Sequence, residues 1–290
     1  MSKFKLAFQS NSTNNNIFWM KNIFYTLLIT LVLSSCSEYQ KALKSEDIAT
    51  KFKLGSDLYD AGKFSKANKL FAQIAPQYRG KPQAEKLMYM YSNSFYQMKD
   101  YYMAGYQFER FEGQYPKSEK AEEALFMSAK SFSKLSPVYS KEQKETITAI
   151  EKLQLFINKY PDSEYLSEAN AIIQELDYKL EKKAFEIAKL YNKIANFESE
   201  DYEASIKAFD NFLLDYPGSS FREEAMFYRF DSAYKLGINS VEYRREERIN
   251  IAIKHYNAFN KAYPESQHNS EASTMINELQ TAILAYTTKS

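Results

Sequence analysis

One tetrad, Tyr-Pro-x-Ser, recurs along the chain and most constrains its fold. Its copies begin at Tyr115, Tyr160, Tyr216 and Tyr263. Large apolar residues stand 4 and 7 positions before each tyrosine, and a small residue stands 11 positions before it. The residues 4 positions before the tyrosines are Phe111, Phe156, Phe212 and Phe259. Those 7 positions before are Phe108, Leu153, Phe209 and Tyr256, and those 11 positions before are Ala104, Ala149, Ser205 and Ala252. Such offsets follow one face of an α-helix, so each tetrad is predicted to end an amphipathic helix.

The proline and the serine of each tetrad predict how the chain leaves this helix. Proline stops a helix because it lacks an N–H and clashes with the preceding turn. Serine is a natural N-cap for the next helix. An alanine 9 positions after each tyrosine then falls inside that next helix; these are Ala124, Ala169, Ala225 and Ala272. A diverged fifth copy ends at Tyr78 and keeps Ala67, Phe71 and Ile74 at the same offsets.

Five copies of helix, turn and helix predict an all-α protein, an α-solenoid of about five tetratricopeptide-like helical hairpins plus a C-terminal helix. Gly55 and Ala67 match the small residues of the tetratricopeptide pattern, where two helices cross closely. The tetrad prolines are 45, 56 and 47 residues apart, which exceeds the usual repeat of about 34. We therefore expect insertions at 136–146, 192–201 and 237–248, N-terminal repeats at 47–135, and C-terminal repeats with a capping helix at 136–290.

The first 35 residues are predicted to be a signal peptide. Lys21 precedes a mostly apolar run at 23–33, which is too short for a bilayer span of roughly 20 residues but suits a signal sequence. Leu33-Ser34-Ser35-Cys36 looks like a bacterial lipobox, which implies cleavage before Cys36, lipidation of its sulfur and a lipidated linker at 36–46. The alternative is an ordinary buried cysteine. Because residues 9–16 are polar and of low complexity, residues 1–19 could precede the true start at Met20.

The remaining composition argues against catalysis and against nucleic-acid binding. One cysteine and two histidines can form neither an intrachain disulfide nor a common zinc site, so we expect no metal and no cofactor. No HExxH, GxSxG or GxGxxG motif occurs, so the chain is predicted not to be an enzyme. The 38 basic and 37 acidic residues nearly balance, whereas nucleic-acid binding needs a basic face.

The lipobox followed by degenerate tetratricopeptide repeats resembles the BamD family, the lipoproteins of outer-membrane β-barrel assembly, in its Bacteroidetes type. The stretches 81–111, 136–143 and 180–188 carry the resemblance most. It implies a lipid-anchored scaffold on the periplasmic face of the outer membrane. The C-terminal repeats would dock on the POTRA domains of the β-barrel insertase, and the N-terminal repeats would receive unfolded outer-membrane proteins.

Two sets of side chains are candidates for these contacts. The first helix of a tetratricopeptide hairpin lines the concave surface, and there we expect Phe52, Ser56, Tyr59, Tyr89, Asn93, Tyr96, Phe126 and Lys130. These would suit an extended peptide with aromatic side chains, although several rings could instead fill the core. Within the charged cluster 242–248, Arg244, Arg245 and Arg248 are predicted to form ionic contacts with the insertase. The alternative there is a solvated loop.

Two other functions fit a lipoprotein of helical repeats. One is a periplasmic tetratricopeptide adaptor for cell-envelope or division proteins, which a pull-down would distinguish. The other is a nutrient-binding lipoprotein of the SusD-like type. Such proteins are much longer and use large insertions to form a glycan site, whereas this chain has a single Trp, which lies in the leader.

Overall fold

The computed structural model describes residues 38–195 and 199–287. The predicted signal peptide and Cys36 lie outside the described residues. The chain divides into two compact units, the first ending at Lys134 and the second beginning at Leu135. The described part is helical throughout and contains no strand, which confirms the predicted all-α fold of tetratricopeptide-like hairpins.

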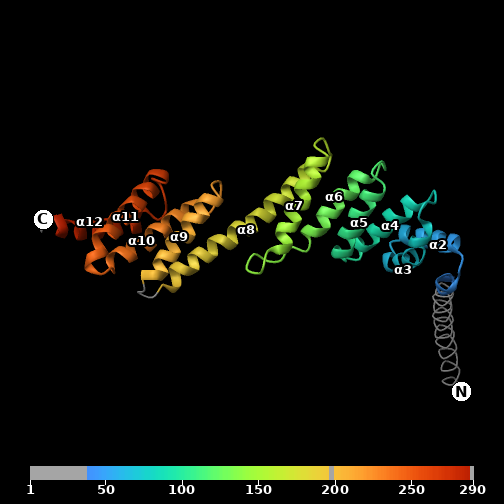
Figure 1. Ribbon diagram of the computed structural model, residues 1–290, viewed down its shortest axis with the longest axis horizontal. Coiled ribbons are helices and arrows are strands. Elements are labelled where there is room, and N and C mark those ends of the chain that lie inside the picture. Colours follow the sequence, from blue (N-terminus) through green and yellow to red (C-terminus); the bar gives the residue numbers. More distant parts are fainter. Residues whose placement is uncertain (1–37, 196–198, 288–290) are drawn as a thin grey trace, which may run out of the picture. The chain divides into compact units, whose positions relative to one another are not determined.

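The first unit contains two complete hairpins and the first helix of a third (Figure 1). A short helical segment at 38–44 precedes them. The helices are α2 (Ile48–Asp60), α3 (Phe64–Ile74), the 3-10 turn η1 (Ala75–Tyr78), α4 (Ala84–Gln97), α5 (Tyr101–Gln114) and α6 (Ala121–Ser133). Helix α2 pairs with α3 and α4 with α5, and each hairpin packs against the helix that follows it.

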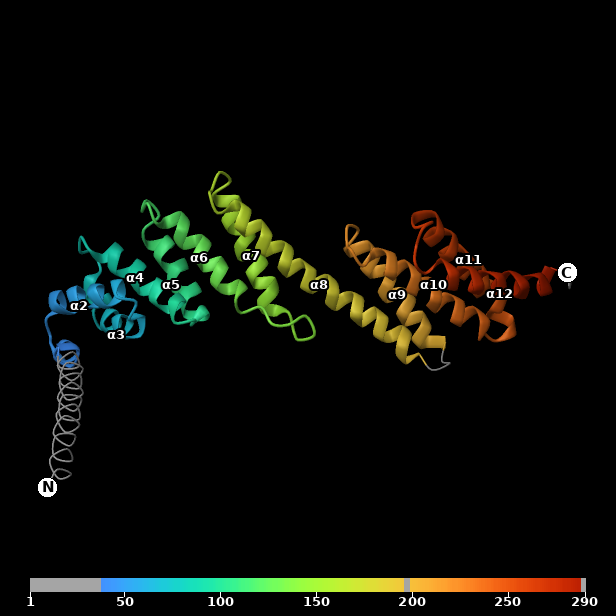
Figure 2. The same ribbon diagram turned by 180° about the vertical axis from the view of Figure 1, so that it is seen from behind.

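The second unit continues the pattern with longer helices (Figure 2). These are α7 (Lys144–Lys159), α8 (Leu166–Ile194), α9 (Ser199–Asp215), α10 (Arg222–Ile238), α11 (Glu242–Ala262) and α12 (Asn269–Thr287). The 29 residues of α8 reach from α7 to the hairpin formed with α9. Helix α12 packs on both α10 and α11, as expected of a capping helix.

The predicted helical register is confirmed by burial. The residues 4 and 11 positions before each tetrad tyrosine are at most 2% exposed, and the four alanines that follow the tetrads are fully buried. Tyr256 is the exception at the middle offset, because it is only partly buried. Small residues are needed where helices cross: a Cβ added to Gly55 would lie 2.6 Å from the Phe71 ring.

The serine of each tetrad does not cap the following α-helix as predicted. The Ser118 amide donates to the Tyr115 carbonyl over 3.0 Å, and Ser118 Oγ accepts from the Lys120 amide, also at 3.0 Å. Helix α6 begins only at Ala121, so the serine stabilises a separate turn between the helices. The same two bonds recur at Ser163, Ser219 and Ser266.

Two of these serines also bond to the first helix of the hairpin that their turn follows. Ser118 Oγ donates to Glu85 Oε1 at the start of α4 over 2.5 Å. Ser266 Oγ donates to Glu223 Oε1 at the start of α10 over 2.6 Å. A tetrad turn therefore bonds to the first turn of the hairpin before it.

The predicted insertions are mostly helical. Helix α8 continues through Ile194, and α10 continues through Ile238. The charged cluster 242–248 is not a solvated loop, because it forms the first two turns of α11. The exception among the three predicted insertions is the first, because the connection at 134–143, between α6 and α7, is non-helical.

Candidate functional site

In the first unit, tyrosines connect the first helices of successive hairpins. The Asn93 side-chain amide of α4 donates to the Tyr59 hydroxyl of α2. The Tyr89 hydroxyl of α4 donates to Glu123 Oε1 of α6 over 2.6 Å. These four side chains therefore lie on one surface formed by α2, α4 and α6.

Three of the aromatic side chains predicted for this surface, Phe52, Tyr89 and Tyr96, are partly exposed and partly packed on other rings. Phe52 stacks on Tyr78 with ring centroids 5.3 Å apart. Tyr89 packs edge-on against Phe108 at 5.9 Å and against Phe111 at 5.7 Å. Tyr96 packs edge-on against Tyr101 at 5.5 Å. Each ring thus has one side fixed by the hairpin core, which holds its exposed edge in place.

The other predicted groove residues have internal roles. Phe126 is 1% exposed and belongs to the core, and Lys130 Nζ lies 5.5 Å from the centroid of its ring. Ser56 Oγ donates to the Phe52 carbonyl of its own helix over 2.9 Å. The Asn93 amide, expected to bond a peptide backbone, already donates to Tyr59.

Two charged residues of this surface were not among the predicted ones. Lys120 Nζ lies 2.7 Å from Glu123 Oε2 and 5.4 Å from the centroid of the Tyr89 ring. Burial alone would raise the pKa of Glu123, but hydrogen bonds from Lys120 and Tyr89 outweigh it and lower that pKa. Tyr89 and Glu123 are 34 residues apart, as are Tyr59 and Asn93. This spacing equals one tetratricopeptide repeat, and that signal could have identified Glu123.

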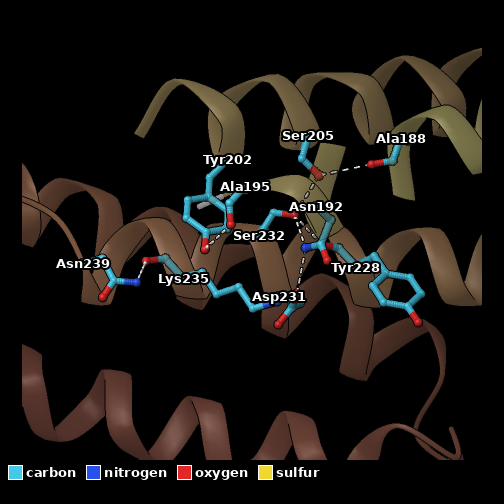
Figure 3. A network of polar contacts seen from close by, with 10 residues as sticks. All are labelled: Ala188, Asn192, Ala195, Tyr202, Ser205, Tyr228, Asp231, Ser232, Lys235 and Asn239. Carbon is cyan, nitrogen blue, oxygen red and sulfur yellow. Dashed lines mark hydrogen bonds and ion pairs between the residues drawn. The ribbon is translucent and has the colours of Figure 1, made fainter. Parts of the chain in front are cut away.

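In the second unit, a buried polar network fixes the inner face of α8 (Figure 3). Asn192 Nδ2 donates to Asp231 Oδ2 and to Ser232 Oγ, each over 2.7 Å. Ser232 Oγ also lies 2.8 Å from Ser205 Oγ, and Lys235 Nζ pairs with Asp231 at 2.6 Å. Because these side chains come from α8, α9 and α10, the network sets the rotation of α8 about its own axis.

The opposite face of α8 carries apolar side chains that remain exposed. Ile187, Leu190, Tyr191 and Ile194 are 44%, 54%, 40% and 48% exposed. Their spacing of 3, 4 and 7 residues is that of the buried stripe of an amphipathic helix. Apolar side chains gathered in this way on a surface mark a contact site for another protein or a membrane. We call these four residues the α8 stripe.

The connection at 134–143 lies beside this face of α8. Lys182 Nζ lies 4.6 Å from the centroid of the Tyr139 ring, and Lys183 Nζ donates to the Lys141 carbonyl over 2.9 Å. Tyr139 lines an open pocket of about 470 Å³ together with Ile187 and Leu190 of the α8 stripe. The connection and the helix therefore present one continuous surface.

The three predicted docking arginines differ in their surroundings. Arg244 is exposed, and its guanidinium lies 5.8 Å from the centroid of the Tyr243 ring. Arg245 is partly buried, and its Nε finds no hydrogen-bond partner among the described residues. Arg248 is 8% exposed, and its guanidinium contacts Glu203 Oε1 of α9 and Ser240 Oγ, both at hydrogen-bonding distance. Arg248 thus attaches α11 to α9.

Nothing in the described part of the chain resembles a metal centre or a membrane span. No group of three or more His, Cys, Asp or Glu residues that could hold a metal ion occurs there. No described helix has the length and apolar character needed to cross a membrane.

Stacked helical hairpins with exposed apolar and charged surfaces define a repeat scaffold, a class of protein that acts through contacts with other proteins. A family model named YfiO, outer membrane lipoprotein, matches residues 45–195 and 194–288. The chain belongs to this family of BamD-like outer membrane lipoproteins.

No curated protein sequence matches this chain. One solved structure, titled "Computational Design of Self-Assembling Cyclic Protein Homooligomers", is 13% identical, with 91% of this chain and 96% of that chain covered. The TM-score of this match is 0.20.

Proposed function

We propose that this protein is the lipid-anchored scaffold of the β-barrel assembly machinery, on the periplasmic face of the outer membrane. Its second unit docks on the POTRA domains of the insertase, and its first unit receives unfolded barrel precursors. The α8 stripe is the observation that carries the proposal. A helix whose inner face is fixed by a buried network keeps four large apolar side chains exposed, and a partner surface would bury them.

The docking proposal predicts that charge on the α8 stripe abolishes assembly with the insertase. Ile187→Asp with Leu190→Asp should cost about 2–4 kcal/mol of binding, because both side chains would lie at the centre of the interface. The measurement is co-purification of the insertase with the tagged protein from solubilised outer membranes. The matched control is Leu214→Asp on α9, a leucine that is 78% exposed. Undiminished co-purification of the double variant would remove the α8 stripe from the interface.

The arginines are tested with the same assay. Arg244→Glu with Arg245→Glu should slow association and change its salt dependence, because charges at the rim of an interface act mainly on encounter. Arg248 is left unchanged, since reversing its charge would place a second carboxylate beside that of Glu203 and disturb the packing of α11 on α9. Association rates that are unaffected at low salt would exclude both residues from the rim.

The substrate proposal concerns the surface shared by α2, α4 and α6. Tyr59, Tyr89 and Tyr96 combine an apolar ring with a polar tip, and each ring is supported on one side. An extended peptide with aromatic side chains could pack against the exposed ring edges. Barrel precursors of the kind implied by the family resemblance commonly end in an aromatic residue, which fits this chemistry.

A synthetic peptide with the C-terminal sequence of a barrel protein tests this surface. Tyr89→Ala with Tyr96→Ala should weaken its binding by up to about 3 kcal/mol while the helix content measured by circular dichroism stays unchanged. The Tyr89→Phe variant keeps the ring on Phe108 and removes only the hydroxyl, so it serves as the structural control. Loss of the fold in the double variant would show that the rings are core residues and would reject the groove.

A further inference from the structure

The N-terminal end of the first unit holds a cleft between the helical segment at 38–44 and helix α2. It has a volume of about 620 Å³ and is open to solvent. Its lining residues recur every three or four positions along both elements, so one face of each helix borders the cleft. They are Glu38, Lys41, Ala42, Ser45, Thr50, Lys53, Leu54 and Asp57. We call it the N-terminal cleft.

The two faces carry the same chemistry in mirrored order. Their hydroxyl ends meet at Asp47, whose amide donates to Ser45 Oγ over 3.0 Å and whose carboxylate accepts from Thr50 Oγ1. Moving away from Asp47, each face presents a lysine and then a carboxylate. These are Lys41 and Glu38 on the segment, and Lys53 and Asp57 on α2.

The four charged side chains are exposed and unpaired. None of them forms an ion pair with another described residue. On each face the carboxylate stands three or four residues beyond the lysine, which is about 4.5–6 Å of helical rise. The cleft thus offers two cationic positions and, roughly 5 Å farther from Asp47, two anionic ones. A ligand with a negative and a positive group joined by a short link would match both.

The cleft has fixed walls, because the segment is packed on the core of the first hairpin. Tyr39 and Ala42 are 8% and 3% exposed and form one cluster with the fully buried Leu70 of α3. Lys66 Nζ of α3 lies 5.3 Å from the centroid of the Tyr39 ring. The segment and α2 therefore belong to one packed body.

The proposed anchor determines what lies beside this cleft. Glu38, which lines it, follows Cys36 by two residues. Two residues of chain span at most about 7 Å. Acyl chains on Cys36 enter the membrane, so the N-terminal cleft lies at the level of the lipid head groups. This step rests on the proposed lipid anchor and on no other part of the proposed function.

We propose that the N-terminal cleft binds the head group of a phosphatidylethanolamine from that membrane. The phosphate pairs with Lys41 and Lys53 and accepts the hydroxyl proton of Ser45, which has no acceptor among the described residues. The ammonium donates its N–H groups to Glu38 and Asp57. Phosphatidylglycerol offers the phosphate without the ammonium, and phosphatidylcholine has a positive charge without an N–H. A head group held in the cleft would fix the first unit against rotation about its anchor.

Native mass spectrometry of the full-length protein, released from detergent that contains one added phospholipid, tests the proposal. The wild type should retain phosphatidylethanolamine on the order of tenfold more than phosphatidylglycerol or phosphatidylcholine, because it alone satisfies both charged pairs. Added salt should reduce this retention, since the pairs are exposed. The lipid on Cys36 is covalent and survives denaturation, whereas the proposed ligand is lost, so the two are distinguished by mass.

Two double variants separate the two ends of the head group. Lys41→Gln with Lys53→Gln should lower the retention of phosphatidylethanolamine and phosphatidylglycerol alike, by roughly tenfold. Glu38→Gln with Asp57→Asn should lower only that of phosphatidylethanolamine, so that the preference disappears. The matched control is Asp60→Asn with Lys63→Gln. It removes one charge of each sign from exposed positions of the same hairpin outside the cleft and should behave as the wild type does.

Three results would overturn the proposal. They are equal retention of the three lipids by the wild type, unchanged retention in the double lysine variant, and displacement of the lipid by micromolar free phosphoethanolamine. The last would identify a soluble zwitterion as the ligand in place of a membrane lipid. The intact mass of the denatured protein tests the anchor separately, and co-purification tests the insertase contact, so each proposal can fail alone.

Discussion

Phe108→Ala is expected to lower the free energy of unfolding of the first unit by about 3–5 kcal/mol. Phe108 is fully buried on α5, and its ring meets Tyr89 edge-on at a centroid distance of 5.9 Å. Replacing the ring with a methyl group would remove the free energy gained by burying it. It would also leave a cavity between α4 and α5, because a close-packed core relaxes only partly around a missing side chain. The cost would be a large part of the stability of a unit of this size.

Urea unfolding followed by circular dichroism would measure this loss. The two units need not unfold together, so hydrogen exchange of the α4 and α5 amides should be followed as well. Tyr102→Ala is the matched control, since Tyr102 lies on the same helix but is 65% exposed. It should change stability by less than about 0.5 kcal/mol. Equal losses for the two variants would contradict the helical register derived from the tetrads.

Cys36→Ala is expected to abolish lipid attachment at the outer membrane. The proposed anchor is acyl chains on this cysteine, each buried CH₂ contributing about 0.8 kcal/mol to membrane affinity. No described helix could replace it by crossing the membrane. The variant should therefore remain uncleaved or appear as soluble protein in the periplasm.

Fractionation of cells and the intact mass of the purified protein provide the readouts. Ser35→Ala keeps a small residue before the cysteine and should be processed and lipidated as the wild type is. An intact mass of the wild type without a lipid adduct would reject the proposed anchor. The fold described for residues 38–195 and 199–287 does not depend on that outcome, because the test concerns the anchor alone.

The fold was largely predictable from the sequence, because helix periodicity and turn chemistry agree along the chain. Phe111, Phe156 and Phe259 repeat at fixed distances before a helix-stopping proline, and all three are fully buried. The solvated loop that was the alternative for the charged cluster 242–248 was wrong. Cluster 242–248 is helical because its Glu and Arg residues are good helix formers and Arg248 is held against α9.

The candidate surfaces were less predictable, since they depend on contacts between distant residues. The spacing of the α8 stripe is that of a buried face, so the sequence alone would place it in the core. The structure shows that the stripe is exposed and that Asn192, on the other face of α8, is buried in the polar network. The 34-residue spacing shared by the Tyr59–Asn93 and Tyr89–Glu123 contacts is a signal that the sequence could have provided.

The bonds of Ser118 to Glu85 and of Ser266 to Glu223 bear on how such a chain can vary in length. They bond these two tetrad turns to the preceding hairpin, so an added residue in either turn would displace the neighbouring repeat. The opposite ends of the hairpins carry no tetrad, and two of the helices that meet there, α8 with 29 residues and α11 with 21, are the longest described helices. Growth or loss of whole helical turns should therefore be tolerated at those ends during divergence, while the length of the Tyr-Pro turns stays constant.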